Sequence, residues 1–201
     1  MEKIINIFGD SIAWGAFDKD GGWVDRLKKD SMRDSSDYNI VYNLSIPNEV
    51  SDELLKRFQI ENEARDPNVI IIAMGVNDSS YTKTKDRVWV PLNRFEENIE
   101  ELIKISRRFT QDIIFVGLIK VDESKTKDNL PEGMDEYIDN QSVIIYNAKI
   151  KEICENNNLL FIEMLDLLND DDLEDGLHPN SKGHEKMFLR IKDFLVENKI
   201  V

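Results

Sequence analysis

The sequence is short of several features that mark whole classes of protein. Among its 201 residues there is a single cysteine, Cys154, so an intrachain disulfide is excluded. No apolar run approaches the roughly 20 residues that a membrane-spanning helix needs. The start of the chain, Met-Glu-Lys, lacks the apolar middle and the cleavage site of a secretory signal. We therefore expect a soluble, cytoplasmic protein without stable membrane insertion, in which Cys154 has a buried apolar role.

Positive charge is also scarce. The chain has 26 basic and 40 acidic residues, which gives a formal net charge of −14 at pH 7. This charge opposes the phosphate backbone that a nucleic-acid-binding protein must neutralise, and it repels an anionic membrane surface. Nucleic acid is therefore not expected as a partner.

Signatures of cofactor and metal binding are missing as well. The chain has no Gly-x-Gly-x-x-Gly, P-loop or Gly-x-Ser-x-Gly pattern. His178 and His184 are six residues apart, which is not the spacing of a metal pair on one helix face, and we expect His184 on a helix surface. The acidic run 170–176 places Leu173 and Lys182 where a calcium loop needs oxygen ligands, so we interpret it as a solvated loop. We expect neither a cofactor nor a metal.

Short apolar runs alternate with longer amphipathic ones, which predicts parallel strands joined by crossover helices. The expected fold is α/β, with one domain over residues 1–201 and a three-layer, flavodoxin-like, five-stranded parallel sheet. The predicted strands are Lys3–Phe8, Asn39–Asn43, Val69–Met74, Asp112–Ile119 and Leu159–Ile162. The predicted helices are Gly22–Lys29, Ser51–Ala64, Asn93–Arg108, Ser142–Asn156 and Ser181–Glu197, the last capped by Ser181.

The two ends of the chain carry the candidate catalytic groups. The first predicted strand runs directly into Gly9-Asp10-Ser11, which places a serine hydroxyl at the end of a strand. Near the other end, Asp175 and His178 supply an acid and a base three residues apart, and Pro179 keeps His178 out of the last helix. A serine hydroxyl needs such a base to attack a carbonyl, and the base needs a group to orient it. The residues therefore indicate a dispersed Ser/His/Asp set.

Three motifs in a fixed order support a family resemblance. Gly9-Asp10-Ser11, Gly75-Val76-Asn77-Asp78 and Asp175-x-x-His178 resemble the first, third and last blocks of the SGNH hydrolases, in the GDSL esterase/lipase family. The first and third blocks each follow a predicted strand. Any one of these motifs alone is typical of an ordinary turn or surface loop, whereas all three in order favour a catalytic set.

The resemblance implies roles for individual residues. Ser11 corresponds to the nucleophile, His178 to the base and Asp175 to the residue that orients it. The oxyanion donors would be the backbone N–H groups of Ser11 and Asn48 and the side-chain amide of Asn77. Three further residues are placed in supporting roles, namely Asp10, Gly75 and Asp78.

The second block of the family is altered in this sequence. Asn48, within the segment Asn43–Val50, stands where the family usually has an oxyanion-binding glycine. Asparagine keeps the backbone N–H and tolerates a positive φ better than most other residues. If Asn48 adopts that backbone conformation, the donor is preserved, and otherwise turnover falls on the order of 100- to 1,000-fold.

The expected activity is hydrolysis of a small carboxylic ester through an acyl-Ser11 intermediate, with a small-molecule ester as the substrate. An acyltransferase on the same triad and a catalytically weakened carbohydrate- or ligand-binding protein stay open as alternatives, as does a homo-oligomer. Trp14 and Trp89 are candidates for pocket aromatics. The polar stretches Ser79–Val90 and Val121–Asp139 are longer than typical connections and are candidate walls or lids.

Overall fold

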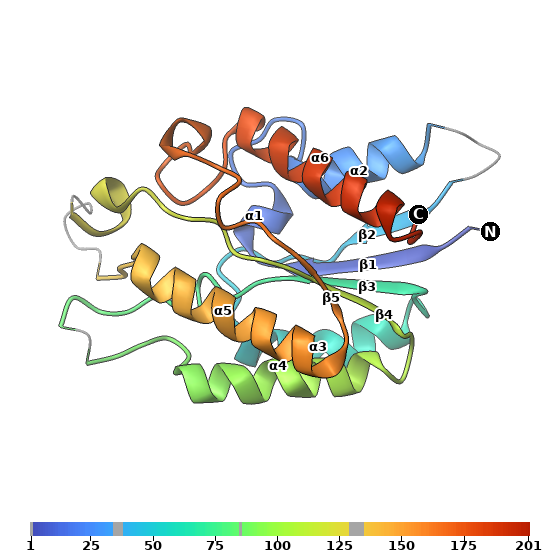
Figure 1. The fold of residues 1–201 in the computed structure, drawn as a ribbon, viewed down its shortest axis with the longest axis horizontal. Helices are drawn as coiled ribbons and strands as arrows, with labels where there is room; N and C mark the ends of the chain where they lie inside the picture. The colour runs from blue at the N-terminus through green and yellow to red at the C-terminus, as the bar shows by residue number, and fades with distance from the viewer. Residues whose placement is uncertain (1, 34–37, 85, 129–134) are drawn as a thin grey trace.

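The computed structural model describes residues 2–33, 38–84, 86–128 and 135–201. Within these residues, five strands form one parallel sheet in the order β2-β1-β3-β4-β5 (Figure 1). Their bounds are β1 Ile4–Gly9, β2 Ile40–Asn43, β3 Val69–Ala73, β4 Asp112–Val116 and β5 Leu160–Ile162. The predicted fold class and all five predicted strands are confirmed.

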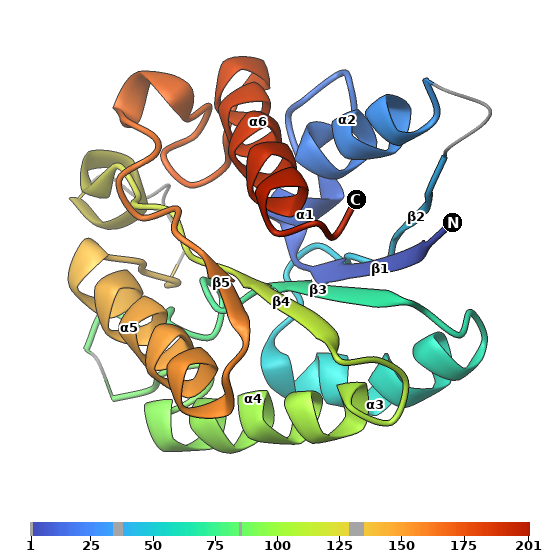
Figure 2. The ribbon, with the colours of Figure 1, turned by 45° about the vertical axis from the view of Figure 1, so that its right-hand side comes forward.

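Helices cover both faces of the sheet. On one face lie α2 (Gly22–Ser31) and α6 (Ser181–Glu197), with the short α1 (Ser11–Trp14) beside them (Figures 1 and 2). On the other face lie α3 (Ser51–Glu63), α4 (Leu92–Ser106) and α5 (Asn140–Asn157). A π-helical turn, η1 (Ser124–Asp128), and a 3₁₀ turn, η2 (Asp170–Asp172), lie in the connections. Among the described helices, none has the length and apolar character needed to cross a membrane.

The sheet is buried on both sides because its central strands are almost entirely apolar and β-branched. Ile5, Ile7 and Phe8 of β1 have no exposed surface, and neither do Ile70 and Ile71 of β3. The core that they form with the helices extends over the whole sheet, and it includes Cys154, which is fully buried as predicted.

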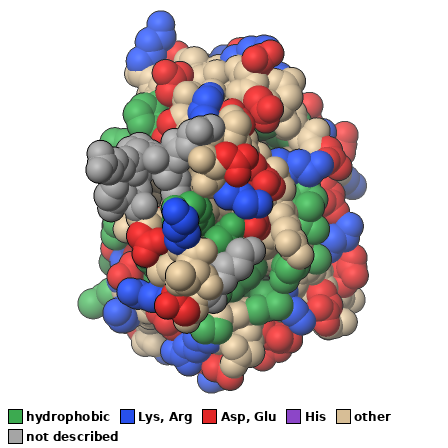
Figure 3. Space-filling view, turned by 90° about the vertical axis from the view of Figure 1, so that its left-hand side faces the viewer, with side chains coloured by type: hydrophobic (Ala, Val, Ile, Leu, Met, Phe, Trp, Pro, Cys, Tyr) green, Lys and Arg blue, Asp and Glu red, His purple; other side chains and the backbone are tan. Residues whose placement is uncertain are grey.

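Parallel strands place their carboxyl ends at one edge of the sheet, and the candidate residues lie there. Ser11 follows β1, Asn48 lies in the connection after β2, and Asn77 follows β3. Figure 3 looks onto this side of the molecule, where hydrophobic side chains lie among acidic and basic ones. The candidate residues thus lie together at the carboxyl end of the sheet.

The predicted helices are present, but their ends differ by up to two residues from the predicted ones. The prediction for β4 was too long, because the strand ends at Val116 and the last bond to β5 is donated by the N–H of Gly117 to the carbonyl of Ile162 at 2.9 Å. The N–H of Leu118 donates to Asn147 Oδ1 at 2.8 Å instead of to a neighbouring strand. The turns α1, η1 and η2 were not predicted, since three to five residues are too few to show a helical period.

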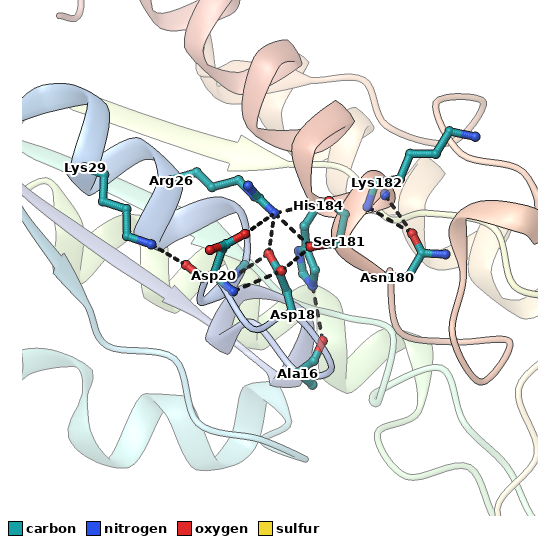
Figure 4. Close-up of polar contacts among 11 residues, drawn as sticks. Ala16, Asp18, Asp20, Arg26, Lys29, Asn180, Ser181, Lys182 and His184 are labelled. Atoms are coloured by element: carbon teal, nitrogen blue, oxygen red, sulfur yellow. Dashed lines mark hydrogen bonds and ion pairs between the residues drawn. The ribbon is translucent and has the colours of Figure 1, made fainter.

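Three predictions about the region around α6 were wrong. The cap of this helix is Asn180, whose Oδ1 accepts from the N–H groups of Lys182 and Gly183, whereas Ser181 Oγ donates to Asp18 at 2.6 Å (Figure 4). His184 is fully buried, because its face of α6 packs against the segment that follows α1. The acidic run is not wholly solvated either, since its last 3₁₀ residue, Asp172, is buried and paired with two lysines, Lys182 and Lys186.

Candidate active site

The nucleophile candidate sits at the junction of β1 and α1. Asp10 follows the last residue of the strand and caps the helix, with its Oδ1 accepting from the N–H of Ile12 at 2.9 Å. Gly9 allows the strand and the helix to approach closely, because a Cβ at this position would lie 2.5 Å from the carbonyl oxygen of Ala73. Ser11 is therefore the first residue of a helix held tightly to the sheet, with 9% of its surface exposed.

Asp10 is buried at this junction, where its side chain supports the turn between β1 and α1. Burial raises the pKa of Asp10 to about 6, although the hydrogen bond from Ile12 and the charge of His178 oppose the shift. Its carboxylate bonds the helix N-terminus, as expected for a residue that supports the turn.

The acid and base candidates lie in a loop that is held by hydrogen bonds between its own residues. Asp175 Oδ1 accepts from the backbone N–H groups of Leu177, at 3.0 Å, and His178, at 2.8 Å. Its other oxygen, Oδ2, lies 2.8 Å from His178 Nδ1. The loop is closed by a hydrogen bond of 2.8 Å from the N–H of Glu174 to the carbonyl of His178. Aspartate and imidazole are thereby fixed in one orientation before any substrate binds.

The two ends of the chain meet in this site. His178 Nε2 lies 2.8 Å from Ser11 Oγ, although the two residues are 167 positions apart. Burial would raise the pKa of Asp175, but the hydrogen bonds from the ring and the backbone of His178 lower it to about 2. The ionised carboxylate can only accept, so the ring proton belongs on Nδ1 and Nε2 is free to accept from Ser11.

Asn48 and Asn77 lie beside the serine. Asn48 adopts the left-handed conformation that is usual for glycine, with a φ of 65°. This is the backbone conformation in which its N–H is expected to remain an oxyanion donor. Asn77 Nδ2 donates to the carbonyl of Glu49 at 3.1 Å, which orients the amide through one of its two hydrogens. Both residues line the same cavity as Ser11.

The remaining residues of the third block, Asp78 and Gly75, lie against helices on one face of the sheet. Asp78 Oδ1 accepts from both the N–H and the hydroxyl of Ser51, the first residue of α3. Burial raises the pKa of Asp78 to about 7. The hydrogen bonds from Ser51 oppose this shift, and the charge of Asp10 adds to it. Gly75 has a φ of 131°, and a Cβ there would lie 3.1 Å from the ring of Phe95. Both residues thus hold the backbone around the cavity in place.

The cavity that contains these groups has a volume of about 480 Å³. Besides Ser11, Asn48, Asn77, Asp175 and His178, its lining consists of Pro47, Lys125, Thr126, Glu136, Ile138 and Leu177. Four of these residues belong to the long stretch 121–139, whose described parts therefore form a wall, while residues 129–134 lie outside the described residues. The other long stretch, 79–90, supports that wall, since Ser80 Oγ donates to Glu136 Oε1 at 2.9 Å.

The aromatic residues are placed differently from the sequence expectation. Neither Trp14 nor Trp89 is among the described residues that line this cavity. Trp14 borders a neighbouring hollow, and Trp89 lies under the guanidinium of Arg87. The aromatic residue that contacts the candidate base is Phe17, whose ring centroid lies 5.3 Å from that of His178. No motif or periodicity of the sequence distinguishes Phe17.

Among the described residues, no group of three or more His, Cys, Asp or Glu side chains is arranged to hold a metal ion. The groups that the site presents are a hydroxyl, an imidazole, a carboxylate and amide donors. These groups together suit nucleophilic attack on a carbonyl carbon.

The sheet order and the two helical layers define a three-layer hydrolase fold of the SGNH type. Residues 7–186 match the model of the GDSL-like Lipase/Acylhydrolase family. The chain belongs to this family, and it is a hydrolase of the esterase kind. No curated protein matches the sequence.

Several solved structures are similar over nearly the whole chain. A lipase/acylhydrolase from Enterococcus faecalis superposes with a TM-score of 0.75 at 22% identity, covering 96% of this chain and 95% of that one. Axe2, an acetylxylan esterase from Geobacillus stearothermophilus, gives 0.74 at 19% identity, covering 97% and 93%. LAE5, an alpha/beta hydrolase enzyme from the metagenome of Lake Arreo, gives 0.73 at 17% identity, covering 96% and 94%. At these identities the likeness establishes the fold.

Proposed function

We propose that the protein is a serine esterase that hydrolyses small carboxylic esters through an acyl-Ser11 intermediate. The observation that carries the proposal is the pair of 2.8 Å contacts that join Ser11 Oγ to His178 and His178 to Asp175. Separations of this size are those that a nucleophile, a base and an orienting carboxylate need for proton transfer.

In the acylation step, Ser11 Oγ attacks the ester carbonyl carbon while its proton moves to His178 Nε2. The carbonyl oxygen becomes negative and is stabilised by the N–H groups of Ser11 and Asn48 and by the amide of Asn77. The tetrahedral intermediate then collapses, and the bond to the alcohol oxygen breaks. His178 returns the proton to that oxygen, so that a neutral alcohol leaves and the acyl group stays on Ser11.

Deacylation repeats these steps with water. His178 takes a proton from a water molecule as the water oxygen attacks the acyl carbon, and the Ser11 oxygen leaves with that proton. Asp175 stays ionised throughout and stabilises the imidazolium formed in each step. The cycle releases a carboxylic acid and regenerates the serine hydroxyl.

A serine-directed phosphonate tests the nucleophile directly. We expect one phosphonyl adduct per chain, located at Ser11 by peptide mass analysis, and loss of turnover of p-nitrophenyl acetate in step with labelling. Ser11→Ala should show no adduct and a turnover several orders of magnitude lower, with an unchanged melting temperature. The matched control is Ser142→Ala on α5, outside the cavity lining, which should label and turn over like the parent protein.

The test also separates the alternatives. A stable protein that binds esters but forms no adduct would be a ligand-binding member of the family, and our proposal would be wrong. An acyltransferase would form the same adduct, but it would pass the acyl group to an added alcohol in preference to water. Product analysis with and without glycerol or xylose as the acceptor distinguishes the two activities.

A further inference from the structure

A second hollow, of about 610 Å³, lies beside α1. The residues of its lining that matter here are Trp14, Phe17, Asp25, Asn43 and Ser45. Phe17 connects this hollow to the candidate active site, because its ring packs edge-on against the imidazole of His178. In the proposed reaction, His178 hands a proton to the leaving alcohol, so the alcohol portion of the ester departs next to Phe17.

Two aromatic side chains of this hollow are exposed to an unusual degree. Trp14 has 53% and Phe17 has 62% of its surface accessible to solvent. Phe17 also has a φ of 62°, a left-handed conformation that is unfavourable for an aromatic residue. An exposed aromatic ring kept in a strained backbone conformation at an active site points to a binding role.

Buried polar contacts hold the backbone on both sides of Phe17 (Figure 4). Before it, the N–H of Ala16 donates to the carbonyl of Ser11 at 3.0 Å, and its own carbonyl lies 3.3 Å from His184 Nε2. After it, Asp18 accepts from Ser181 Oγ at 2.6 Å and from Arg26 at 2.8 Å. The ring is therefore presented to solvent by a segment anchored to α2 and α6.

The hollow also contains an unused hydrogen-bonding group. Ser45 is 8% exposed, and its hydroxyl has no hydrogen-bond partner among the described residues. The neighbouring Asn43 is fixed, since its Nδ2 donates to the carbonyl of Ala13 at 3.1 Å and its Oδ1 accepts from the N–H of Ser45 at 3.2 Å. A buried hydroxyl without a partner is costly, so its position at the wall of a hollow suits a ligand that bonds to it.

We propose that this hollow is a subsite for the alcohol portion of the ester, and that this portion is a saccharide. A sugar ring presents apolar C–H faces that pack on the rings of Trp14 and Phe17, and hydroxyls that bond to Ser45. The carboxylate of Asp25 and the ammonium of Lys19 belong to residues that border the same hollow, which disfavours an aliphatic chain. The inference rests on the proposed function and names its substrate class, an acylated sugar.

Binding of sugars without an acyl group tests the subsite separately from catalysis. The parent for this experiment is Ser11→Ala, titrated by calorimetry with xylotriose, cellotriose and maltotriose, and with hexan-1-ol as the aliphatic probe. We expect saturable binding of at least one saccharide. In the Ser11→Ala/Trp14→Ala variant, the Kd should rise about tenfold or more, because a ring that packs on the sugar is lost.

The matched control is Ser11→Ala/Tyr42→Ala, which removes an exposed aromatic of β2 outside the hollow and should bind like the parent. The inference is overturned if no saccharide binds, if hexan-1-ol binds in place of the sugars, or if the Trp14 variant binds as tightly as the parent. Turnover of p-nitrophenyl acetate that survives in Ser11→Ala would instead refute the catalytic proposal, and the binding result would stand apart from it.

Discussion

The two segments that meet in the candidate site are held in place by different means. The nucleophile segment is buried, and it is fixed by the sheet, by the close contact that Gly9 allows and by the cap from Asp10. The acid–base segment lies at the surface, where 41% of the Asp175 side chain is exposed, and it is fixed by hydrogen bonds within its own loop. Tertiary packing positions the candidate nucleophile, whereas local backbone geometry positions the candidate base.

The difference also appears in the electrostatics of the two carboxylates. Burial dominates for Asp10 and raises its pKa to about 6, whereas hydrogen bonds to His178 outweigh burial for Asp175 and lower its pKa to about 2. Near neutral pH, Asp175 is therefore fully ionised and able to stabilise an imidazolium. The ionised form of Asp10 is destabilised by burial, although its carboxylate caps the N-terminus of α1.

The largest effect is expected where the acid–base segment is broken. Asp175→Asn should lower kcat on p-nitrophenyl acetate by roughly 10⁴-fold, because an amide no longer holds the required ring tautomer. The melting temperature at pH 7 should fall, because the charge-assisted hydrogen bond from His178 is lost, but the loop should keep its conformation, since the amide oxygen still accepts from the N–H groups of Leu177 and His178. Steady-state kinetics and thermal unfolding measured on the same preparation check both statements.

The pH dependence of stability sharpens this prediction. The folded-state pKa of Asp175 lies below its ordinary value, so its ionised form stabilises the fold above about pH 4, and this contribution is lost as the pH falls toward 2. The variant with asparagine should lack that part of the acid dependence. Kinetics close to those of the parent protein would show that the exposed carboxylate does not orient the base.

Asn77→Ala is expected to have a smaller effect on kcat. Asn77 is buried, like the nucleophile segment and unlike Asp175. Removing the amide should lower kcat by about 100- to 1,000-fold, with KM affected less, because its donor is needed mainly in the transition state. Loss of the bond to the carbonyl of Glu49 should also cost about 1 kcal/mol of the free energy of unfolding.

Asn98→Ala is the control for this variant. Asn98 is also a buried asparagine, whose Nδ2 donates to Ser51 Oγ at 2.8 Å, and it does not line the cavity. Its replacement should lower stability by a similar amount and affect kcat far less. If Asn77→Ala changed KM alone, Asn77 would have no part in stabilising the oxyanion.

The contrast between local geometry and tertiary packing also explains how much of the structure could be predicted from the sequence. Apolar runs and short motifs are local features, so the strands, the sheet class and the juxtaposition of Ser11 with Asp175 and His178 could be predicted. The burial of His184 and the strained exposure of Phe17 depend on contacts between distant segments. No local pattern predicts the hydrogen bond between Ser181 and Asp18, because the two residues are 163 positions apart.

The smallest effect on turnover is expected for Asp10→Asn, which tests whether Asp10 serves the fold alone. Burial raises the folded-state pKa of Asp10 from 3.8 to about 6, so the protein loses stability as the pH rises through this interval, by about 3 kcal/mol. The variant has no charge to bury and should escape this loss. Its free energy of unfolding in urea, relative to that of the parent protein, should therefore increase between pH 4 and pH 7.5. A kcat reduced as far as that of Asp175→Asn would instead place Asp10 in proton transfer, and the distinction between a structural and a chemical carboxylate would fail.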